Sequence, residues 1–96
     1  MAEVSHKKYF VYVLWSDSGH RFYIGSSESV EQRLAQHNNG KSRWTKRYAG
    51  SWKLVWQREF DSIGNARKYE TLLKHQKKGN GFFRLTGLGH FQASGS

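Results

Sequence analysis

Tyr23, Arg33 and His37 are the residues of this sequence whose types and spacing best suit chemistry on a phosphate group. Tyrosine and histidine can exchange protons, and the donor fork of an arginine guanidinium matches phosphate oxygens. Arg33 and His37 are four residues apart, so on a helix they lie side by side. The three residue types together suit a phosphodiester substrate. The four-residue spacing of the arginine and the histidine is by itself more often that of a surface arginine beside a partly buried histidine.

Tyr12 and Tyr23 fall in two stretches that we expect to pair as antiparallel strands, so that their hydroxyls can converge. A tyrosine acts as a general base only where nearby cations favour the phenolate, and this basic sequence would supply them. The alternative is two aromatic residues in the core of a sheet, which is the default for the pattern. Gly25 follows Tyr23-Ile24 directly and would let a backbone or a phosphate approach closely.

Glu70 is the acidic residue best placed to hold a metal ion. The sequence has only seven Asp and Glu residues, and the others fall in the N-terminal segment, in a turn or at the ends of predicted elements. Glu70 lies beside the apolar face of a predicted helix, where a carboxylate requires a cation or a metal ion as partner. An equally supported alternative is a surface ion pair with Lys74, worth roughly 0.3–0.5 kcal/mol.

The excess of cations is the second functional signal. Sixteen Lys and Arg residues give a formal net charge of +9, which favours a polyanionic partner because phosphate neutralisation releases counterions. The alternative is a basic surface that serves solubility, and the basic amphipathic helix of a membrane-surface protein is not evident. We expect the DNA backbone to follow two basic stretches, whose cations are Lys41, Arg43, Lys46, Arg47, Lys53, Lys74, Lys77 and Lys78.

Length and composition predict one domain in a reducing compartment. The 96 residues leave no room for a second domain, so we expect a domain over 9–90 between tails at 1–8 and 91–96. Cysteine is absent, which excludes disulfides and thiolate metal sites. A secretory signal and a bilayer-spanning apolar run are not evident. We therefore expect a cytoplasmic protein without a membrane partner.

Hydrophobic patterns predict the strands. Runs of aromatic and β-branched residues indicate strands over 9–15, 21–24 and 52–60. Turn residues at 16–20 join the first two strands into an antiparallel hairpin.

Capping signals predict the helices. Ser29 and Gln32 have the spacing of a capping box, which indicates a helix over 30–38 that ends at Gly40. Ser62 can cap a second helix that ends before Gly79. The apolar face of this helix and a short closing element would complete the core with Ile63, Ala66, Tyr69, Leu73, Phe82, Phe83, Leu85 and Leu88. The order of elements predicts an α+β fold, a small antiparallel sheet with helices packed on it.

Five ordered blocks of the sequence, within a stretch from about Tyr9 to Leu88, resemble the GIY-YIG nuclease domain, in particular its small stand-alone bacterial form. The family's first motif keeps its tyrosine as Tyr12, while its Gly-Ile is replaced by Phe10-Val11. The five blocks are Tyr23-Ile24-Gly25-Ser26-Ser27, Val30-Glu31-Gln32-Arg33-Leu34 with His37-Asn38 and Gly40, Thr45-Lys46, Trp52-Lys53-Leu54-Val55, and Ala66-Arg67-Lys68-Tyr69-Glu70 with Leu73-Lys74.

The resemblance implies a three-stranded antiparallel sheet flanked by helices and a divalent-metal nuclease site. In family terms, the site residues are Tyr12, Tyr23, Arg33, His37 and the metal ligand Glu70. A single available carboxylate favours one Mg²⁺ or Mn²⁺ ion. The family's late asparagine matches Asn80 only loosely.

Together these features predict a divalent-metal-dependent DNA endonuclease that uses water as its nucleophile. Tyr23 or Tyr12 would take the proton, with a relay through His37, and Arg33 would hold the scissile phosphate. The alternatives are a non-catalytic nucleic-acid-binding module on the same fold and, with less support, a protein-interaction domain whose charge serves solubility. The sequence does not decide whether the substrate is duplex, branched or single-stranded DNA. It also leaves open whether the protein acts with a homodimer partner or an accessory protein, and whether its setting is DNA repair or the processing of mobile DNA.

Overall fold

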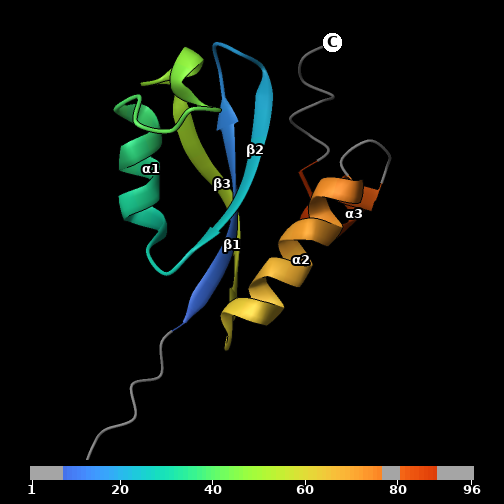
Figure 1. Ribbon diagram of the computed structural model, residues 1–96. Coiled ribbons are helices and arrows are strands. Elements are labelled where there is room, and N and C mark those ends of the chain that lie inside the picture. Colours follow the sequence, from blue (N-terminus) through green and yellow to red (C-terminus); the bar gives the residue numbers. More distant parts are fainter. Residues whose placement is uncertain (1–7, 77–80, 89–96) are drawn as a thin grey trace, which may run out of the picture.

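A three-stranded antiparallel sheet lies at the centre of the protein, with helices on both of its sides (Figure 1). The computed structural model describes residues 8–76 and 81–88. Its elements are β1 (Tyr9–Ser16), β2 (Arg21–Ser27), α1 (Val30–Asn38), the short 3₁₀ turn η1 (Lys46–Tyr48), β3 (Trp52–Phe60), α2 (Ile63–Gln76) and α3 (Gly81–Thr86). The predicted α+β class is confirmed.

The strand order is β2-β1-β3, so β1 is paired on both edges. Val11, Tyr12, Val13 and Leu14 are all buried, which explains why this almost wholly apolar stretch takes the central position. The two faces of β1 alternate along the strand, with Tyr12 and Leu14 on one face and Val11 and Val13 on the other. Each face therefore requires its own cover of helices.

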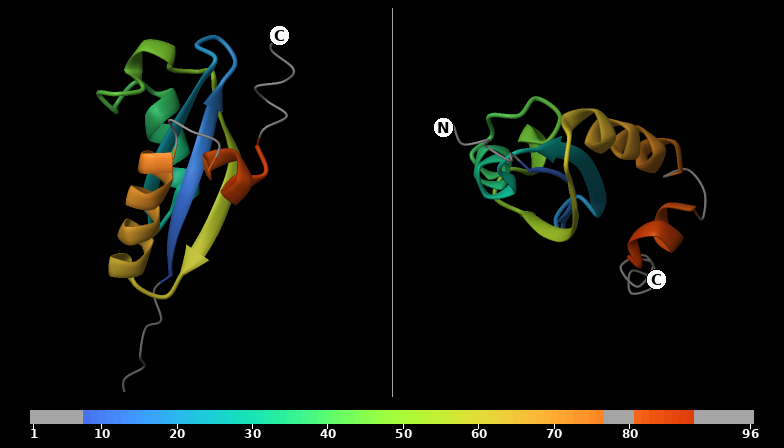
Figure 2. Two further views of the ribbon diagram at one scale, coloured as in Figure 1. Left: turned by 90° about the vertical axis from the view of Figure 1, so that its right-hand side faces the viewer. Right: turned by 90° about the horizontal axis from the view of Figure 1, so that it is seen from below.

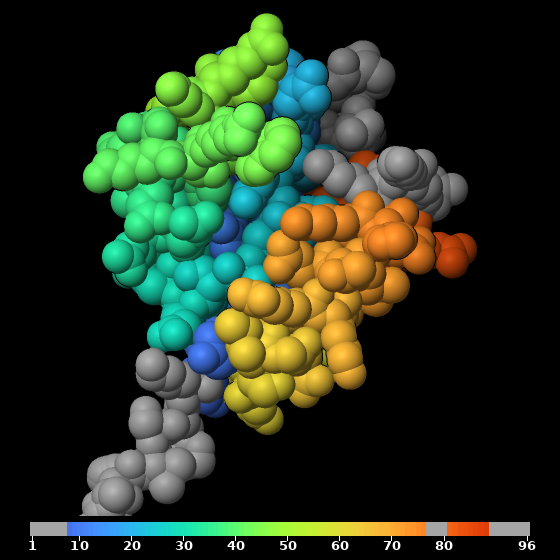
Figure 3. Space-filling view, viewed as in Figure 1, coloured from blue at the N-terminus to red at the C-terminus, as the bar shows by residue number. Residues whose placement is uncertain are grey.

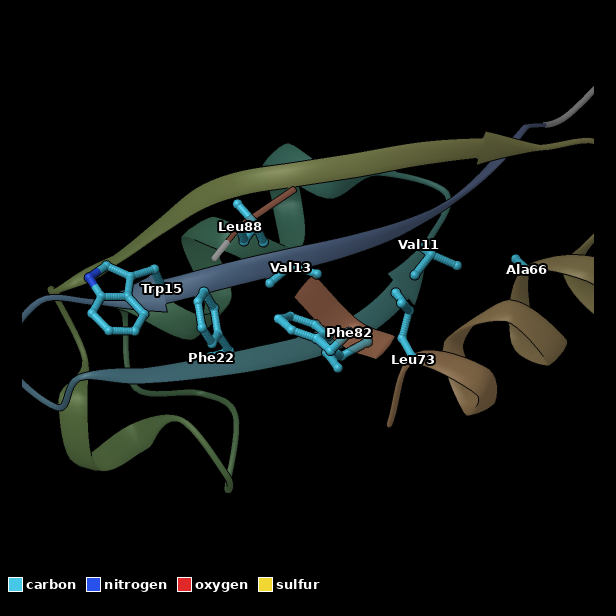
Figure 4. Close-up of a cluster of buried hydrophobic side chains, with 9 residues drawn as sticks. Val11, Val13, Trp15, Phe22, Ala66, Leu73, Phe82 and Leu88 are labelled. Carbon is cyan, nitrogen blue, oxygen red and sulfur yellow. The ribbon is translucent and has the colours of Figure 1, made fainter. Parts of the chain in front are cut away.

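The two faces of the sheet form two separate clusters of buried side chains. One cluster joins the strands to α2, α3 and Leu88, and Figure 4 shows its members Leu73 and Phe82 against β1 and β2. The other cluster lies under α1 and includes Val30 and Trp52. Figure 2 shows the same division from two further directions, with α1 on one side of the strands and α2 and α3 on the other.

The strand β2 is longer than the sequence predicts. Its pairing with β1 continues to Phe10↔Ser27, which brings Gly25 and Ser26 into the sheet rather than into a loop after it. The pairing Tyr12↔Gly25 and Leu14↔Tyr23 sets the two tyrosines diagonally on one face of the hairpin. This register is what positions the candidate site.

The helix α1 has the predicted bounds. Ser29 Oγ accepts a hydrogen bond from the backbone N–H of Gln32 at 3.3 Å, as expected for the N-cap. The reciprocal half of the capping box is replaced, because the backbone N–H of Ser29 donates to Ser27 Oγ at 3.0 Å. Gly40 has a φ of 76°, a left-handed conformation that suits glycine at the end of a helix.

The helix α2 begins after Ser62, whose Oγ accepts from the backbone N–H of Asn65 at 3.1 Å. Ala66 and Leu73 are buried as predicted. The prediction is wrong for Ile63, which is 45% exposed because it opens the helix beyond the end of β3. It is also wrong for Leu85, 40% exposed on the short helix α3.

Several predictions fall partly or wholly outside the described residues. They concern the tails at 1–7 and 91–96, the cations Lys77 and Lys78, and Asn80. Lys8, the last residue of the predicted N-terminal tail, is described and pairs with Glu59 at 2.6 Å. Within 8–76 and 81–88, the helices all lack the length and apolar character that a membrane span requires.

Candidate active site

An open cleft of about 410 Å³ lies between α1 and α2, over the hairpin β1–β2. Its lining residues are Tyr12, Tyr23, Gly25, Ser26, Arg33, Arg67, Glu70 and Thr71. Figure 3 shows α1 and α2 on either side of this region, with atoms of the strands β1 and β2 between them. The structure thus brings four of the five predicted site residues to one cleft, and the fifth, His37, contacts Tyr12 from below.

Gly25 makes room for the phenol of Tyr12. A Cβ atom at position 25 would lie 2.6 Å from Tyr12 Oη and 2.7 Å from Tyr12 Cζ, which is closer than non-bonded atoms approach. The sequence suggested that a backbone or a phosphate would come close to this glycine, and the structure places the tyrosine ring there instead. Gly25 is therefore part of the packing of the site.

His37 is completely buried and bonded on both sides of its ring. Its Nε2 lies 3.1 Å from Tyr12 Oη, and its Nδ1 lies 2.6 Å from Thr45 Oγ1. The Tyr23 ring packs against it with ring centroids 4.6 Å apart. Because both ring nitrogens are occupied and the residue has no exposed surface, the hydrogen bond to Tyr12 is the one that connects His37 to the lining of the cleft.

Thr45 contributes to the site, although its residue type and its place in a polar loop do not indicate this. It is fully buried although it lies in the basic segment between α1 and β3, and its carbonyl accepts from Trp52 Nε1 at 2.9 Å. Hydrophobic periodicity gives no signal for a buried hydroxyl in a polar loop. The only available signal was the position of Thr45 in one of the blocks that resemble the family.

Burial controls the protonation of Tyr12 and His37. It raises the pKa of Tyr12 to about 12, against the opposing effect of the Arg33 guanidinium. It lowers the pKa of His37 to about 4, and the positive charge of Arg33 acts in the same direction. At neutral pH, Tyr12 therefore holds its proton and His37 is neutral. The expectation that nearby cations favour the phenolate is wrong for Tyr12, because desolvation outweighs them.

Arg33 contributes a permanent positive charge to the cleft. The adjacent hydroxyl of Tyr12 raises the pKa of the guanidinium above its ordinary value. One guanidinium nitrogen, Nη1, donates to Gln36 Oε1 at 2.7 Å, one turn along α1. This contact orients the donor fork, while the lining of the cleft by Arg33 leaves it accessible to an anion.

Arg67 is a second cation of the cleft that was not among the predicted site residues. It lines the main cleft and also a neighbouring cavity of about 340 Å³. Its spacing of three residues from Glu70 on α2 is the signal that could have identified it, since such residues share a helix face. Two arginines from two helices therefore border the same space.

Both oxygens of the Glu70 carboxylate have partners. Ser26 Oγ donates to Oε1 at 2.7 Å, and Lys74 Nζ lies 2.8 Å from Oε2. The ion pair that the sequence left as an alternative is therefore formed, and the carboxylate still lines the cleft. Its side chain is 19% exposed, against 55% for that of Lys74.

The oxygen atoms of the cleft that are suited to bind a metal fit a hydrated Mg²⁺ ion rather than an ion enclosed by protein. Within the described part of the chain, His, Cys, Asp and Glu side chains nowhere gather in groups of three or more suitable for a metal. Mg²⁺ commonly keeps several waters and binds one or two carboxylates together with substrate phosphates. Glu70, with the Ser26 hydroxyl beside it, meets that requirement, and the exposed ammonium of Lys74 is free to move aside.

Two of the predicted DNA-binding cations that the structure describes are paired with acidic side chains. Lys53 pairs with Asp17 at 3.3 Å, and Lys74 pairs with Glu70. The segment between α1 and β3 carries Lys41, Arg43, Lys46 and Arg47. In this segment the guanidinium carbons of Arg43 and Arg47 each lie 5.8 Å from the ring centroid of the following aromatic residue.

Comparison with known proteins identifies the family of this chain. The family model described as the GIY-YIG catalytic domain matches residues 8–82. A UPF0213 protein of Streptococcus pneumoniae serotype 4 is 37% identical over 75 residues, which are 78% of this chain and 74% of that protein. A UPF0213 protein of Staphylococcus saprophyticus is 31% identical over 74 residues, which are 74% of this chain and 89% of that protein. A UPF0213 protein of Lactiplantibacillus plantarum is 34% identical over 74 residues, which are 75% of this chain and 72% of that protein. The chain therefore belongs to the GIY-YIG family of nuclease domains.

Proposed function

We propose that this protein is a divalent-metal-dependent DNA endonuclease that hydrolyses a phosphodiester in the cleft between α1 and α2. The observation that carries the proposal is the convergence of Tyr23, Arg33 and Glu70 on one open, polar cleft. They come from a strand and two helices that are well separated in the sequence. Packing alone would not require these three side chains to line the same cavity. A phosphodiester hydrolase requires it, because its reacting groups must surround one substrate.

The two arginines of the cleft bind the scissile phosphate. Arg33 is charged at every physiological pH and is oriented by Gln36, so its donors are set before the substrate arrives. Arg67 faces the same space from α2. As water attacks phosphorus and the bond to the 3′ oxygen breaks, negative charge grows on the phosphoryl oxygens, and fixed donors stabilise it most at that point.

The phenolate form of Tyr23 is assigned as the general base that takes the proton of the attacking water and thereby becomes the neutral phenol. Tyr12 is almost fully buried, and its raised pKa makes it hold its own proton. His37 is buried and bonded to Tyr12 and Thr45. Of the three residues predicted to exchange protons, Tyr23 is the one that remains; it is half-buried and lines the cleft together with Arg33 and Arg67.

Tyr12 and His37 position this base rather than react. The Tyr12 and Tyr23 rings lie 6.3 Å apart between centroids, and His37 contacts both. A neutral imidazole donates from one nitrogen and accepts at the other, so the chain Tyr12–His37–Thr45 is oriented in one direction. The chain therefore fixes the tyrosine pair at the base of the cleft.

Glu70 would hold one Mg²⁺ or Mn²⁺ ion, with the Ser26 hydroxyl as its neighbour. When bound, such an ion supplies positive charge that stabilises the leaving 3′ oxygen. Before that, Lys74 neutralises the carboxylate. This existing pair is also the observation that favours the second candidate, a DNA-binding module without cutting, because a fully partnered Glu70 is stable without a metal ion.

A cutting assay with matched carboxylate variants separates the two candidates. Duplex, branched and single-stranded DNA are incubated with Mg²⁺ and wild type, Glu70→Gln, Arg33→Ala or Glu59→Gln. Glu59 is the control because it also pairs with a lysine, Lys8, but lies outside the cleft. We expect cutting to be lost in Glu70→Gln and Arg33→Ala and kept in Glu59→Gln. Wild-type binding without cutting would favour the module, and cutting by Glu70→Gln would show that the metal site is misplaced.

A further inference from the structure

Trp44 has an environment that the proposed chemistry does not explain. Its side chain is 79% exposed, and the other large apolar side chains counted as exposed in the described residues reach at most 45%. It lies in a stretch, residues 41–53, with five cations and no acidic residue. The guanidinium carbon of Arg43 lies 5.8 Å from the centroid of the Trp44 ring. A large exposed aromatic ring with a cation beside it matches the groups that stack on nucleobases.

The residue next to Trp44 is among the most firmly held in the protein. Thr45 is fully buried, and its hydroxyl bonds to His37 at 2.6 Å. Its carbonyl accepts from the Trp52 indole at 2.9 Å, and its backbone N–H donates to the Ser42 carbonyl at 3.2 Å. The backbone that carries the exposed ring is thus fixed before any ligand binds, which reduces the entropy lost on binding.

The segment that carries Trp44 is connected to the lining of the cleft by hydrogen bonds. Thr45 contacts His37, and His37 contacts Tyr12, so two hydrogen bonds connect the neighbour of Trp44 to a residue that lines the cleft. Figure 3 shows the segment between α1 and β3, in green, on the same face of the molecule as the region between α1 and α2. A strand that leaves the cleft on this side would meet this segment.

We propose that Trp44 is a stacking platform for an unpaired nucleobase, so that the protein prefers DNA with a single-stranded arm next to the scissile bond. This inference rests on the proposed function, since it names the substrate class of the same site. Bases inside a duplex already stack on their neighbours, and only an unpaired base offers its π-face to a protein ring. Arg43 and Arg47 would meanwhile contact the phosphates of the arm.

Stacking differs from the general attraction of a basic surface in a way that binding assays can separate. Electrostatic attraction depends on the number of phosphates and is equal for DNAs with equal charge. Stacking depends on the presence of a free base and is tolerant of its sequence, because every base has a π-face. The DNAs in the test therefore carry equal numbers of phosphates, and the normal and abasic arms differ only in their free bases.

Binding is measured by fluorescence anisotropy in EDTA, which prevents cutting, with three labelled DNAs: a blunt duplex, a duplex with a single-stranded arm, and the same armed duplex with abasic sites in the arm. The proteins are wild type, Trp44→Leu, Trp44→Phe and the control Leu85→Ala, which removes an exposed apolar side chain on α3. Thermal unfolding confirms that each variant is folded.

We expect Trp44→Leu to weaken binding of the armed duplex by roughly 5- to 150-fold, the range that corresponds to the loss of one stacked base. Wild type should bind the abasic arm as weakly as Trp44→Leu binds the normal arm. Trp44→Phe should retain most of the affinity, and Leu85→Ala all of it. Equal weakening for armed and blunt DNA, or unchanged binding in Trp44→Leu, would overturn the inference.

The same DNAs with Mg²⁺ distinguish this inference from the proposed function. Cutting by wild type without any preference for the armed duplex refutes stacking and leaves the nuclease intact. Preference for the armed duplex without cutting of any DNA supports stacking and refutes the nuclease. A cutting nuclease that uses Trp44 should show the preference in both binding and cleavage.

Discussion

The two sides of the sheet are built from the same alternating strands but differ in what they bury. The side under α2 and α3 packs Val11, Phe22, Leu73 and Phe82 into an apolar cluster. The side under α1 combines apolar residues with a chain of buried polar groups centred on His37. In the described residues, every buried side-chain nitrogen and oxygen on either side has a hydrogen-bond partner.

This difference suggests a division of labour between stability and chemistry. Apolar burial is insensitive to small rearrangements, and it stabilises a fold without fixing the position of any particular polar atom. A hydrogen-bonded chain is sensitive to each of its members, because removal of one partner leaves another buried group unsatisfied. Changes within the apolar cluster under α2 and α3 should therefore affect mainly stability, and changes within the buried polar chain under α1 should affect the cleft out of proportion to stability.

The largest expected effect is on the apolar side. Phe82→Ala removes a fully buried ring between Phe22 and Phe83, and we expect the free energy of unfolding to fall by about 3–5 kcal/mol. Urea unfolding measures the loss, and cutting per folded molecule should be unchanged. A specific loss of cutting in the folded fraction would contradict the division between the two sides.

Gly25→Ala is the corresponding change on the polar side. The new Cβ would lie 2.6 Å from Tyr12 Oη and force the ring out of its place, so we expect a loss of about 1–3 kcal/mol in stability and a larger fractional loss of cutting. Gly64→Ala is the matched control, because a Cβ at Gly64 on α2 would meet no atom within 4 Å. In the control, stability should stay equal or rise by up to about 1 kcal/mol. Full activity in Gly25→Ala would show that the position of Tyr12 is unimportant.

The sequence could predict the elements better than their mutual register. The ranges of α1 and β3 follow from capping residues and from an apolar pattern, which are local signals. The end of β2 depends on how far β1 pairs with it, and the contact between Gly25 and Tyr12 exists only in that register.

The residues of the candidate site also divide into those that local signals reveal and those that only the folded structure reveals. Tyr23, Arg33 and Glu70 were identifiable by residue type and by resemblance, because their chemistry is visible in the sequence. The partnership of Thr45 with His37 was not, since it depends on a polar loop that returns to the inner face of α1. The protonation of Tyr12 was also hidden, because the charge of the neighbourhood is visible in the sequence while the degree of burial is not.

The pH dependence of stability sharpens the comparison on the polar side. The pKa of His37 is lowered from 6.5 to about 4, so between these values the unfolded chain binds a proton that the folded protein does not. The contribution of His37 to stability is therefore complete above about pH 6.5 and is lost as the pH falls toward 4. The slope is at most about 1.4 kcal/mol per pH unit.

Denaturant unfolding across this range, compared between wild type and His37→Gln, isolates the effect of the histidine from that of the carboxylates. We expect the steeper acid-side slope in wild type only. Titration of the His37 ring followed by NMR gives an independent value of its pKa. A midpoint near 6.5 in the folded protein would show that burial does not control the pKa of this histidine.

The smallest effect on stability is expected for Lys74→Met. This variant tests whether Lys74 competes with a metal ion for Glu70. The Lys74–Glu70 pair is half-exposed on the lysine side, so its loss should change the free energy of unfolding by less than about 0.5 kcal/mol. Removal of the competing ammonium should nevertheless tighten Mn²⁺ binding at Glu70, as measured by calorimetry. Lys8→Met, which breaks the similar pair with Glu59, should leave Mn²⁺ binding unchanged. Weaker Mn²⁺ binding in Lys74→Met would mean that Lys74 supports the metal site instead of competing with it.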